Sequence, residues 1–265
     1  MARVIAVANQ KGGVGKTTTA VNVASCLAEV GYKTLLVDLD PQGNATTGVG
    51  VDPRTLHSSM YQVLVGQKTI DETIIKTSMQ RLFVVPSNLD LAGAEIELVS
   101  VFSRELRLRN AIALVQDKYD YVIIDCPPSL GILTINGLAA AEEVVIPVQC
   151  EYYALEGLGQ LLNNVKLIQQ NLNKYLFVSS IVLVMFDART RLAEQVLNEV
   201  RTHFPDQVRE TVIPRSVRLS EAPSYGQPVN QYDPLSKGAI AYKALANEIT
   251  EQTIGFKNNE KGIYR

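Results

Sequence analysis

The chain has 265 residues, of which 46% are hydrophobic and 20% are charged, and its formal net charge is −2. These values fit one large domain with a buried core, and they exclude attraction to nucleic acid or membranes through bulk charge alone. No stretch approaches the ~20 apolar residues of a membrane span. Three cysteines without a CxxC pair favour a reducing, cytosolic compartment, and the N-terminus does not resemble a signal peptide.

Short apolar runs alternate with helical patterns along the chain. The first run, Val4–Ala8, precedes a glycine-rich turn and a helical pattern over Thr18–Val30, where apolar residues recur at helix spacing. Further strands are predicted at Thr34–Asp38, Leu82–Pro86, Tyr121–Asp125, Val144–Val148, Val178–Val184 and Val208–Ile213. Further helices are predicted near Arg104–Gln116, Glu156–Asn171, Arg191–Phe204 and Lys237–Thr250.

This alternation predicts an α/β fold with a doubly wound, mostly parallel sheet and helices on both faces. Ligands of such sheets bind at the carboxyl ends of the strands. No linker or repeat divides the chain, so residues 1–250 are expected to form a single domain. The polar tail, Glu251–Arg265, is expected to fray.

The segment "NQKGGVGKTT", from Asn9 to Thr18, lies between the first strand and the first helix. A glycine-rich turn in that position predicts a phosphate-binding loop, because backbone amides and the helix N-terminus attract phosphate groups. Lys16 is expected to reach the β- and γ-phosphates, and the Thr17 hydroxyl is expected to bind Mg²⁺ directly. The residues expected to surround the phosphates are Lys11, Gly12, Gly13, Val14, Gly15, Lys16, Thr17 and Thr18.

The loop departs from the pattern GxxxxGK[ST], because Gln10 stands at its first position and Lys11 follows. At the loop entrance a side chain tends to point outward, so Lys11 is poorly placed to duplicate Lys16 within its own subunit. It is well placed to meet the phosphates of a second, facing subunit, as an arginine finger does. The alternative is a solvated surface lysine.

These motifs resemble those of the ParA/Soj family of bacterial chromosome- and plasmid-partitioning ATPases, which have a deviant Walker A phosphate loop. The resemblance extends from Val4 to about Ile249 and includes KGGVGKT at the loop. It also includes "DLDPQGNATTG" (Asp38–Gly48), "LAGAEIEL" (Leu91–Leu98), "DYVIIDCPPSLG" (Asp120–Gly131), "PVQCEYYALEGL" (Pro147–Leu158), "MFDART" (Met185–Thr190) and "IPRSVRLSEAPSYG" (Ile213–Gly226). It implies a P-loop ATPase fold, ATP or ADP with Mg²⁺ as ligands, and an ATP-sandwich homodimer in which Lys11 contacts the partner's nucleotide.

Carboxylates follow two of the predicted strands. Asp125 ends the apolar run Tyr121–Asp125, which has the form of a Walker B strand, so its carboxylate is expected to hold Mg²⁺ through water. Asp38 and Asp40 follow the second strand. Asp40 matches the aspartate that orients the attacking water in the family, with metal contact through water, whereas Asp38 is the weaker candidate for a direct role.

The resemblance places the adenine base along Pro214, Arg215 and Ser216, with Met185 nearby. Many relatives have asparagine where this chain has Ser216, so the polar group that reads adenine stays open. Glu151 is a candidate contact to the ribose of the partner's nucleotide.

The DNA surface also depends on the resemblance, since composition alone favours solvated charge. The family binds DNA non-specifically through basic residues at matching positions, and a ParB-type centromere-binding partner stimulates its otherwise weak hydrolysis. It implies a cytoplasmic, nucleoid-associated protein. The candidate DNA contacts are Arg189, Arg218, Lys237 and Lys243.

Three alternative functions share this fold. A membrane-surface switch like the division-site ATPase MinD needs a basic amphipathic terminal helix, and the tail is interrupted by Gly255 and Gly262. Electron transfer like that of the nitrogenase iron protein needs two cluster cysteines, and Cys126 has no obvious second. A metabolic kinase or amide synthase is disfavoured by the MFDART and RLSEAPS blocks. Because the chain starts directly at its first strand, without a helix-turn-helix domain, we expect a chromosomal or small-type relative without operator binding.

Overall fold

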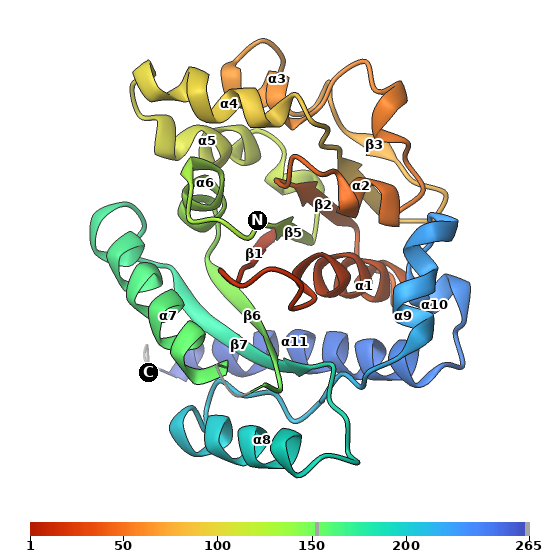
Figure 1. The fold of residues 1–265 in the computed structure, drawn as a ribbon. Coiled ribbons are helices and arrows are strands. Elements are labelled where there is room, and N and C mark those ends of the chain that lie inside the picture. The colour runs from red at the N-terminus through yellow and green to blue at the C-terminus, as the bar shows by residue number, and fades with distance from the viewer. Residues whose placement is uncertain (152–153, 263–265) are drawn as a thin grey trace.

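The computed structural model describes residues 1–151 and 154–262, with side chains as far as Glu251 (Figure 1). The strands are β1 (Arg3–Val7), β2 (Thr34–Asp38), β3 (Ile75–Lys76), β4 (Leu82–Val85), β5 (Tyr121–Asp125), β6 (Glu143–Gln149) and β7 (Phe177–Val184). The longer helices are α1 (Lys16–Glu29), α6 (Ile132–Ala140), α7 (Ala154–Asn171), α8 (Arg191–His203) and α11 (Lys237–Gly262). The short ones are α2 (Asn44–Gly48), α3 (Met60–Val65), α4 (Leu91–Glu97), α5 (Arg107–Ala113), α9 (Val217–Glu221) and α10 (Val229–Tyr232), with 3₁₀ turns η1 (Pro53–Thr55), η2 (Leu98–Ser100), η3 (Arg104–Leu106), η4 (Gln116–Lys118) and η5 (Ala222–Tyr225).

The strands of the described chain form one sheet in the order β3-β4-β2-β5-β1-β6-β7. All neighbours are parallel except β3, which pairs antiparallel with β4 at the edge. Parallel strands need crossover connections, and these are the helices on the two faces (Figure 1). The predicted doubly wound fold class is therefore confirmed.

Successive residues of the central strand β1 point to opposite faces of the sheet and enter two separate cores. Val4 and Ala6 belong to the core beneath α4 to α8, whereas Ile5 and Val7 belong to the core beneath α1 and α11. A strand buried on both faces reads as an unbroken apolar run, which is why β1, β2 and β5 were visible in the sequence.

The predicted strand at Val208–Ile213 is wrong. The segment follows β7 but forms only the isolated bridges Ile181 to Val208 and Phe186 to Pro214. Between them, the N–H groups of Glu210 and Thr211 donate to the side chain of Glu248 in α11, at 3.1 and 2.8 Å. A ladder cannot continue where a side chain from another element takes the strand's amides.

The helical pattern near Arg104–Gln116 is divided into η3, α5 and η4, so only its middle is α-helix. At the C-terminus α11 continues to Gly262, so this part of the polar tail has helical backbone. The expected fraying of the tail and the single-domain boundary at residue 250 stay predictions, and Ile263–Arg265 lie outside the described residues. Within the described chain, no helix combines the length and apolar character needed to cross a membrane.

Candidate nucleotide site

The phosphate loop joins β1 to α1 at the carboxyl edge of the sheet (Figure 1). Gly13 and Gly15 have φ angles of 74° and 78°, in the left-handed region that favours glycine. Gly15 is also the N-cap of α1 and supplies no side-chain cap, so the first amides of the helix stay available to an anion. Asn9 anchors the entrance, because its side chain accepts from the Lys11 N–H at 3.1 Å and donates to the Pro147 carbonyl at 2.8 Å.

Lys16 is only 7% exposed and turns back over its own loop. Its Nζ donates to the carbonyl oxygen of Lys11 at 3.0 Å. Burial lowers the pKa of Lys16, and the nearby carboxylates of Asp125 and Asp40 oppose that change. A buried ammonium whose bond goes to a neutral carbonyl is prepared to exchange that partner for a phosphate oxygen.

Asp125 ends β5, in register with Val7 of β1 and Asp38 of β2. Its side chain is fully buried, and neither carboxylate oxygen has a hydrogen-bond partner among the described residues. Burial raises the pKa of Asp125 well above its ordinary value, and Asp38 raises it further, while Thr17 and Lys16 oppose the shift. A buried carboxylate without a donor, beside a threonine hydroxyl, fits a hydrated Mg²⁺ in its donor chemistry.

Asp38 and Asp40 differ in their surroundings. Asp38 is fully buried and accepts from the Thr46 N–H at 2.8 Å, the Thr46 hydroxyl at 2.7 Å and the Asp40 N–H at 3.0 Å. Its carboxylate therefore fixes the start of α2 to the end of β2. Asp40 is partly exposed, and among the described residues only the Gln42 N–H, at 2.9 Å, donates to its carboxylate. Asp40 is thus the carboxylate of this pair that is open to a water molecule.

A cavity of about 360 Å³ adjoins the phosphate loop. The structure brings all four residues predicted at the adenine, Met185, Pro214, Arg215 and Ser216, into its lining. Gly15 and Thr18 of the loop complete the lining on one side, so a nucleoside here would continue from phosphates in the loop. Sequence reasoning missed the six other lining residues, although three of them lie in the RLSEAPS block: Val184, Ile213, Leu219, Ser220, Pro223 and Tyr242.

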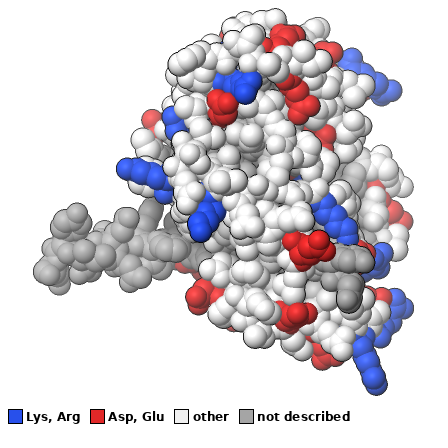
Figure 2. Space-filling view, turned by 60° about the vertical axis from the view of Figure 1, so that its left-hand side comes forward, with Lys and Arg blue, Asp and Glu red and all other residues white. Residues whose placement is uncertain are grey.

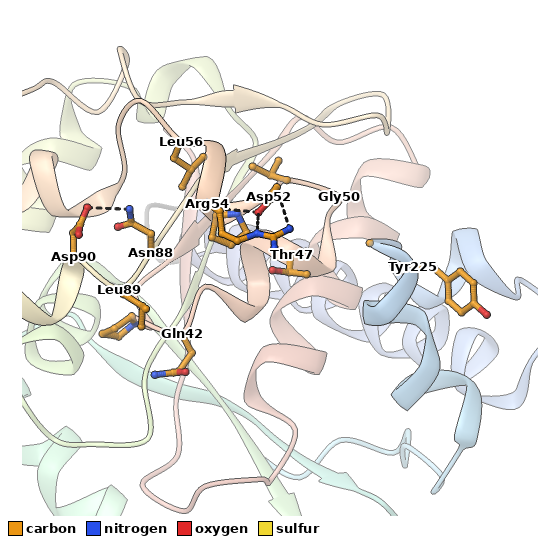
Figure 3. A pocket seen from close by; sticks show the side chains of 14 residues that line it. Gln42, Thr47, Gly50, Asp52, Arg54, Leu56, Asn88, Leu89, Asp90 and Tyr225 are labelled. Carbon is orange, nitrogen blue, oxygen red and sulfur yellow. Dashed lines mark hydrogen bonds and ion pairs between the residues drawn. The ribbon is translucent and has the colours of Figure 1, made fainter.

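A larger cavity, of about 930 Å³, lies elsewhere (Figure 3). It lies between the segment after Asp40, which includes Pro41 and Gln42, and Tyr225, and no residue of the phosphate loop lines it. At its edge Gly50 and Gly226 touch through their backbones: a Cβ on Gly226 would come within 3.1 Å of the Gly50 Cα. Of these two cavities, only the smaller one is lined by residues of the phosphate loop.

Lys11 lies at the surface of the loop, with its side chain 48% exposed. Its Nζ lies 2.6 Å from Oε2 of Glu151, just beyond β6. Glu151 is itself 47% exposed and also accepts from the Gln149 amide at 2.5 Å. The two lysines of the motif therefore differ in position: Lys16 is enclosed in the subunit, and Lys11 faces outward.

The four candidate DNA contacts lie on the β7–α8 loop, on α9 and on α11. Among the described residues three of them are paired with carboxylates: Arg189 with Asp187 at 2.7 Å, Arg218 with Glu221 at 2.9 Å and Asp233 at 3.2 Å, and Lys243 with Glu29 at 2.9 Å. Lys237 is exposed at the first residue of α11. On the face drawn in Figure 2, basic and acidic side chains are interspersed, without a large area of one sign. The sequence did not show this local neutralisation.

Several known proteins are similar to this chain over most of its length. A family profile described as an AAA domain matches residues 2–178. The sporulation initiation inhibitor protein Soj of Bacillus subtilis is 56% identical over 94% of this chain and 98% of its own length. The chromosome partitioning protein ParA of Myxococcus xanthus is 52% identical, over 94% of this chain and 88% of its own length.

The chain belongs to the ParA/Soj family of chromosome-partitioning ATPases. Among solved structures, one named cobyrinic acid a,c-diamide synthase, from Mycobacterium smegmatis with ADP and magnesium, matches this ParA/Soj chain with a TM-score of 0.83. It is 41% identical and covers 94% of both chains. The same protein was also solved with an ATP analogue and magnesium. The name of this structure states a different activity from the names of the more similar ParA/Soj relatives.

Proposed function

We propose that this chain is an ATP-driven DNA-segregation switch. ATP binding closes two subunits face to face, the dimer binds double-stranded DNA without sequence preference, and a ParB-type partner stimulates hydrolysis and release. The observation that carries the proposal is the placement of the two lysines. Lys16 and Asp125 are buried, whereas Lys11 is half-exposed at the same loop, where its side chain is accessible to a second molecule.

The chemistry follows from the positions of the side chains. Lys16 holds the β- and γ-phosphates, and the loop amides from Gly12 to Thr18 surround them. Thr17 would hold Mg²⁺ directly, and Asp125 and Asp40 would hold it through water; the bound ion would supply charge that neutralises the phosphates. Asp40 orients the attacking water, for which its partly exposed carboxylate is accessible. Lys11 of the facing subunit adds positive charge where negative charge develops in the transition state.

The nucleoside is assigned to the cavity lined by Met185, Pro214, Arg215 and Ser216. Its apolar members pack against the base, and the backbone between Pro214 and Ser216 offers polar groups to the ring edge. The names of the M. smegmatis structures, with ADP or an ATP analogue and magnesium, support the choice of ligands. Binding to DNA makes the protein cytoplasmic and nucleoid-associated.

The test separates nucleotide binding, hydrolysis and DNA binding. Lys16→Ala should lose most ATP affinity in a titration with a fluorescent nucleotide, because the charge on the phosphates is deleted. Asp40→Ala should bind ATP and DNA but hydrolyse slowly, because only the position of the water is lost. With ATP, the parent chain should bind random duplex DNA and leave anionic liposomes unbound. Tight ATP binding by Lys16→Ala, or DNA binding that ignores ATP, would contradict the proposal.

Amide synthesis is the second candidate, because the M. smegmatis structure shares 41% of its sequence with this chain. The curated relatives that are more similar, at 56% and 52%, are named for sporulation control and chromosome partitioning. An assay with ATP, cobyrinic acid and glutamine or ammonia decides between them. We expect ATP hydrolysis without an amide product. Accumulation of the diamide would mean that amide synthesis, and not DNA segregation, is the function of this chain.

A further inference from the structure

A short chain of contacts joins the two lysines of the phosphate loop to the end of β6. Lys16 Nζ donates to the Lys11 carbonyl at 3.0 Å, and Lys11 Nζ lies 2.6 Å from the Glu151 carboxylate. We name this Lys16–Lys11–Glu151 series the lysine relay. Asn9 holds the backbone beneath it, because its side chain bonds both the Lys11 N–H and the Pro147 carbonyl of β6. The two Asn9 bonds therefore hold the phosphate loop against β6 whether or not the Lys11–Glu151 pair is formed.

We propose that Glu151 holds Lys11 back in the isolated subunit, and that nucleotide phosphate releases it through Lys16. The inference rests on the proposed function, in which Lys11 reaches the nucleotide of a facing subunit. To contact a phosphate across a dimer interface, Lys11 has to extend away from its own subunit, and the Glu151 carboxylate, 2.6 Å from its Nζ, opposes that movement. Opening of the Lys11–Glu151 pair therefore favours closure of two subunits.

Lys16 supplies the link to nucleotide. Its present acceptor is the neutral carbonyl of Lys11, whereas a phosphate oxygen carries full negative charge. Both hydrogen bonds are charge-assisted through the ammonium, but the bond to phosphate joins two ions and adds their Coulomb attraction. Phosphate in the loop therefore takes Lys16 Nζ from Lys11, which loses one of the two bonds that fix its backbone and keeps only the bond from its N–H to Asn9.

The strength of the pair suits a reversible restraint. An ion pair with both side chains about half-exposed shifts an equilibrium by up to about fivefold. Two such pairs open per dimer, so the restraint shifts the dimer dissociation constant by up to about 25-fold. The bond from Gln149 to the other oxygen of Glu151, at 2.5 Å, keeps the carboxylate in position after Lys11 leaves.

The first experiment measures dimerisation by light scattering during ATP titration, in the slowly hydrolysing Asp40→Ala background. Glu151→Gln keeps an acceptor oxygen and the side-chain shape but removes the charge that holds Lys11. We expect it to tighten the ATP dimer by up to about 25-fold. The matched control is Asp71→Asn, which breaks the Lys118–Asp71 pair of the same 2.6 Å length and similar exposure. Dimerisation of Glu151→Gln no tighter than that of Asp71→Asn overturns the inference.

The second experiment follows Lys11 within a single subunit. Gly12→Val, which has room for the side chain inside the monomer, should keep the chain monomeric. Acetylation of Lys11 is timed by mass spectrometry, with Lys118 as the internal reference. We expect slow acetylation without nucleotide, and severalfold faster acetylation after Glu151→Gln or after addition of ATP. An unchanged rate with Glu151→Gln refutes the restraint, and an unchanged or lower rate with ATP refutes the release step.

The two failures can be told apart. If the parent chain forms no ATP dimer, or if Lys11→Ala dimerises as well as the parent, the proposed function is wrong. Acetylation of the nucleotide-free chain then still reports whether Glu151 restrains Lys11. If the parent dimer needs Lys11 but Glu151→Gln leaves dimerisation and acetylation unchanged, the lysine relay alone is wrong.

Discussion

Gly12→Val is the substitution that best separates two roles of the phosphate loop: nucleotide binding within one subunit and contact between two subunits. A Cβ added at Gly12 meets no atom within 4 Å, and Gly12 is not among the glycines with positive φ. The substitution therefore neither disturbs side-chain packing nor strains the backbone of the isolated subunit. We expect the free energy of unfolding to change by no more than about 0.5 kcal/mol, and the ATP affinity of the monomer to stay near that of the parent.

The ATP dimer should be lost, because the branched side chain fills space that the facing subunit needs at the phosphates. Gly13→Val is the matched control. Gly13 also has no neighbour within 4 Å of an added Cβ, but its φ of 74° strains a branched residue by about 1–3 kcal/mol. That strain weakens ATP binding in the monomer by about fivefold or more if it falls on the nucleotide-bound loop.

Three measurements on the same proteins decide the outcome: urea unfolding, titration with a fluorescent ATP analogue, and light scattering with ATP. The expected pattern is normal stability and ATP binding without dimerisation for Gly12→Val, and impaired ATP binding for Gly13→Val. If Gly12→Val formed the ATP dimer like the parent, the face around Lys11 would not be an interface.

Two other predictions concern charge. Arg218→Glu should abolish DNA binding by the ATP dimer at moderate salt, and the residual binding at low salt should have a slope of log affinity against log salt reduced by about 1.8, because two phosphate contacts are lost. Glu221→Gln should instead strengthen DNA binding by the ATP dimer, because the Arg218 guanidinium loses a competing carboxylate at 2.9 Å. Weaker binding in gel shifts would refute this. Burial raises the pKa of Asp38 to about 6 from 3.8, so its contribution to the stability of the nucleotide-free chain is complete below pH 4 and is lost as pH rises through 6. Asp38→Asn should reduce this dependence in urea unfolding at pH 4.5 and 7.5, and an equal difference from the parent at both pH values would contradict it.

The sequence predicted those parts of the fold that depend on local pattern. β1, β2 and β5 were found within a residue, because strands buried on both faces have to be continuously apolar. Helices such as α2 and α9 have five residues each and were missed, since a helix this short forms only with tertiary contacts. For α2 that contact is the bond from Thr46 to the buried Asp38. The false strand at Val208–Ile213 failed for the same kind of reason, because Glu248 competes for its amides.

The candidate site likewise contains residues that the sequence predicted and contacts that it did not. Spacing identified the phosphate loop, and the resemblance identified the four residues that the structure brings together in the nucleoside cavity. The pairing of Lys11 with Glu151 spans 140 positions, and that of Lys243 with Glu29 spans 214. No local pattern carries such information. Whether a charge is available or already neutralised is therefore decided by the fold.

The backbone contact between Gly50 and Gly226 has a mechanical consequence. Side chains absorb small shifts by changing rotamer, but here a Cβ on either glycine would come within about 3 Å of the other's backbone, so no side chain separates the two segments. Gly50 follows α2, which starts four residues after Asp40, and Gly226 follows α9 and η5, which start beside Arg218. Because the two backbones are already in contact, α2 cannot move toward η5 without displacing η5. This rigid backbone contact thus joins the segment that follows Asp40 to the segment that carries Arg218.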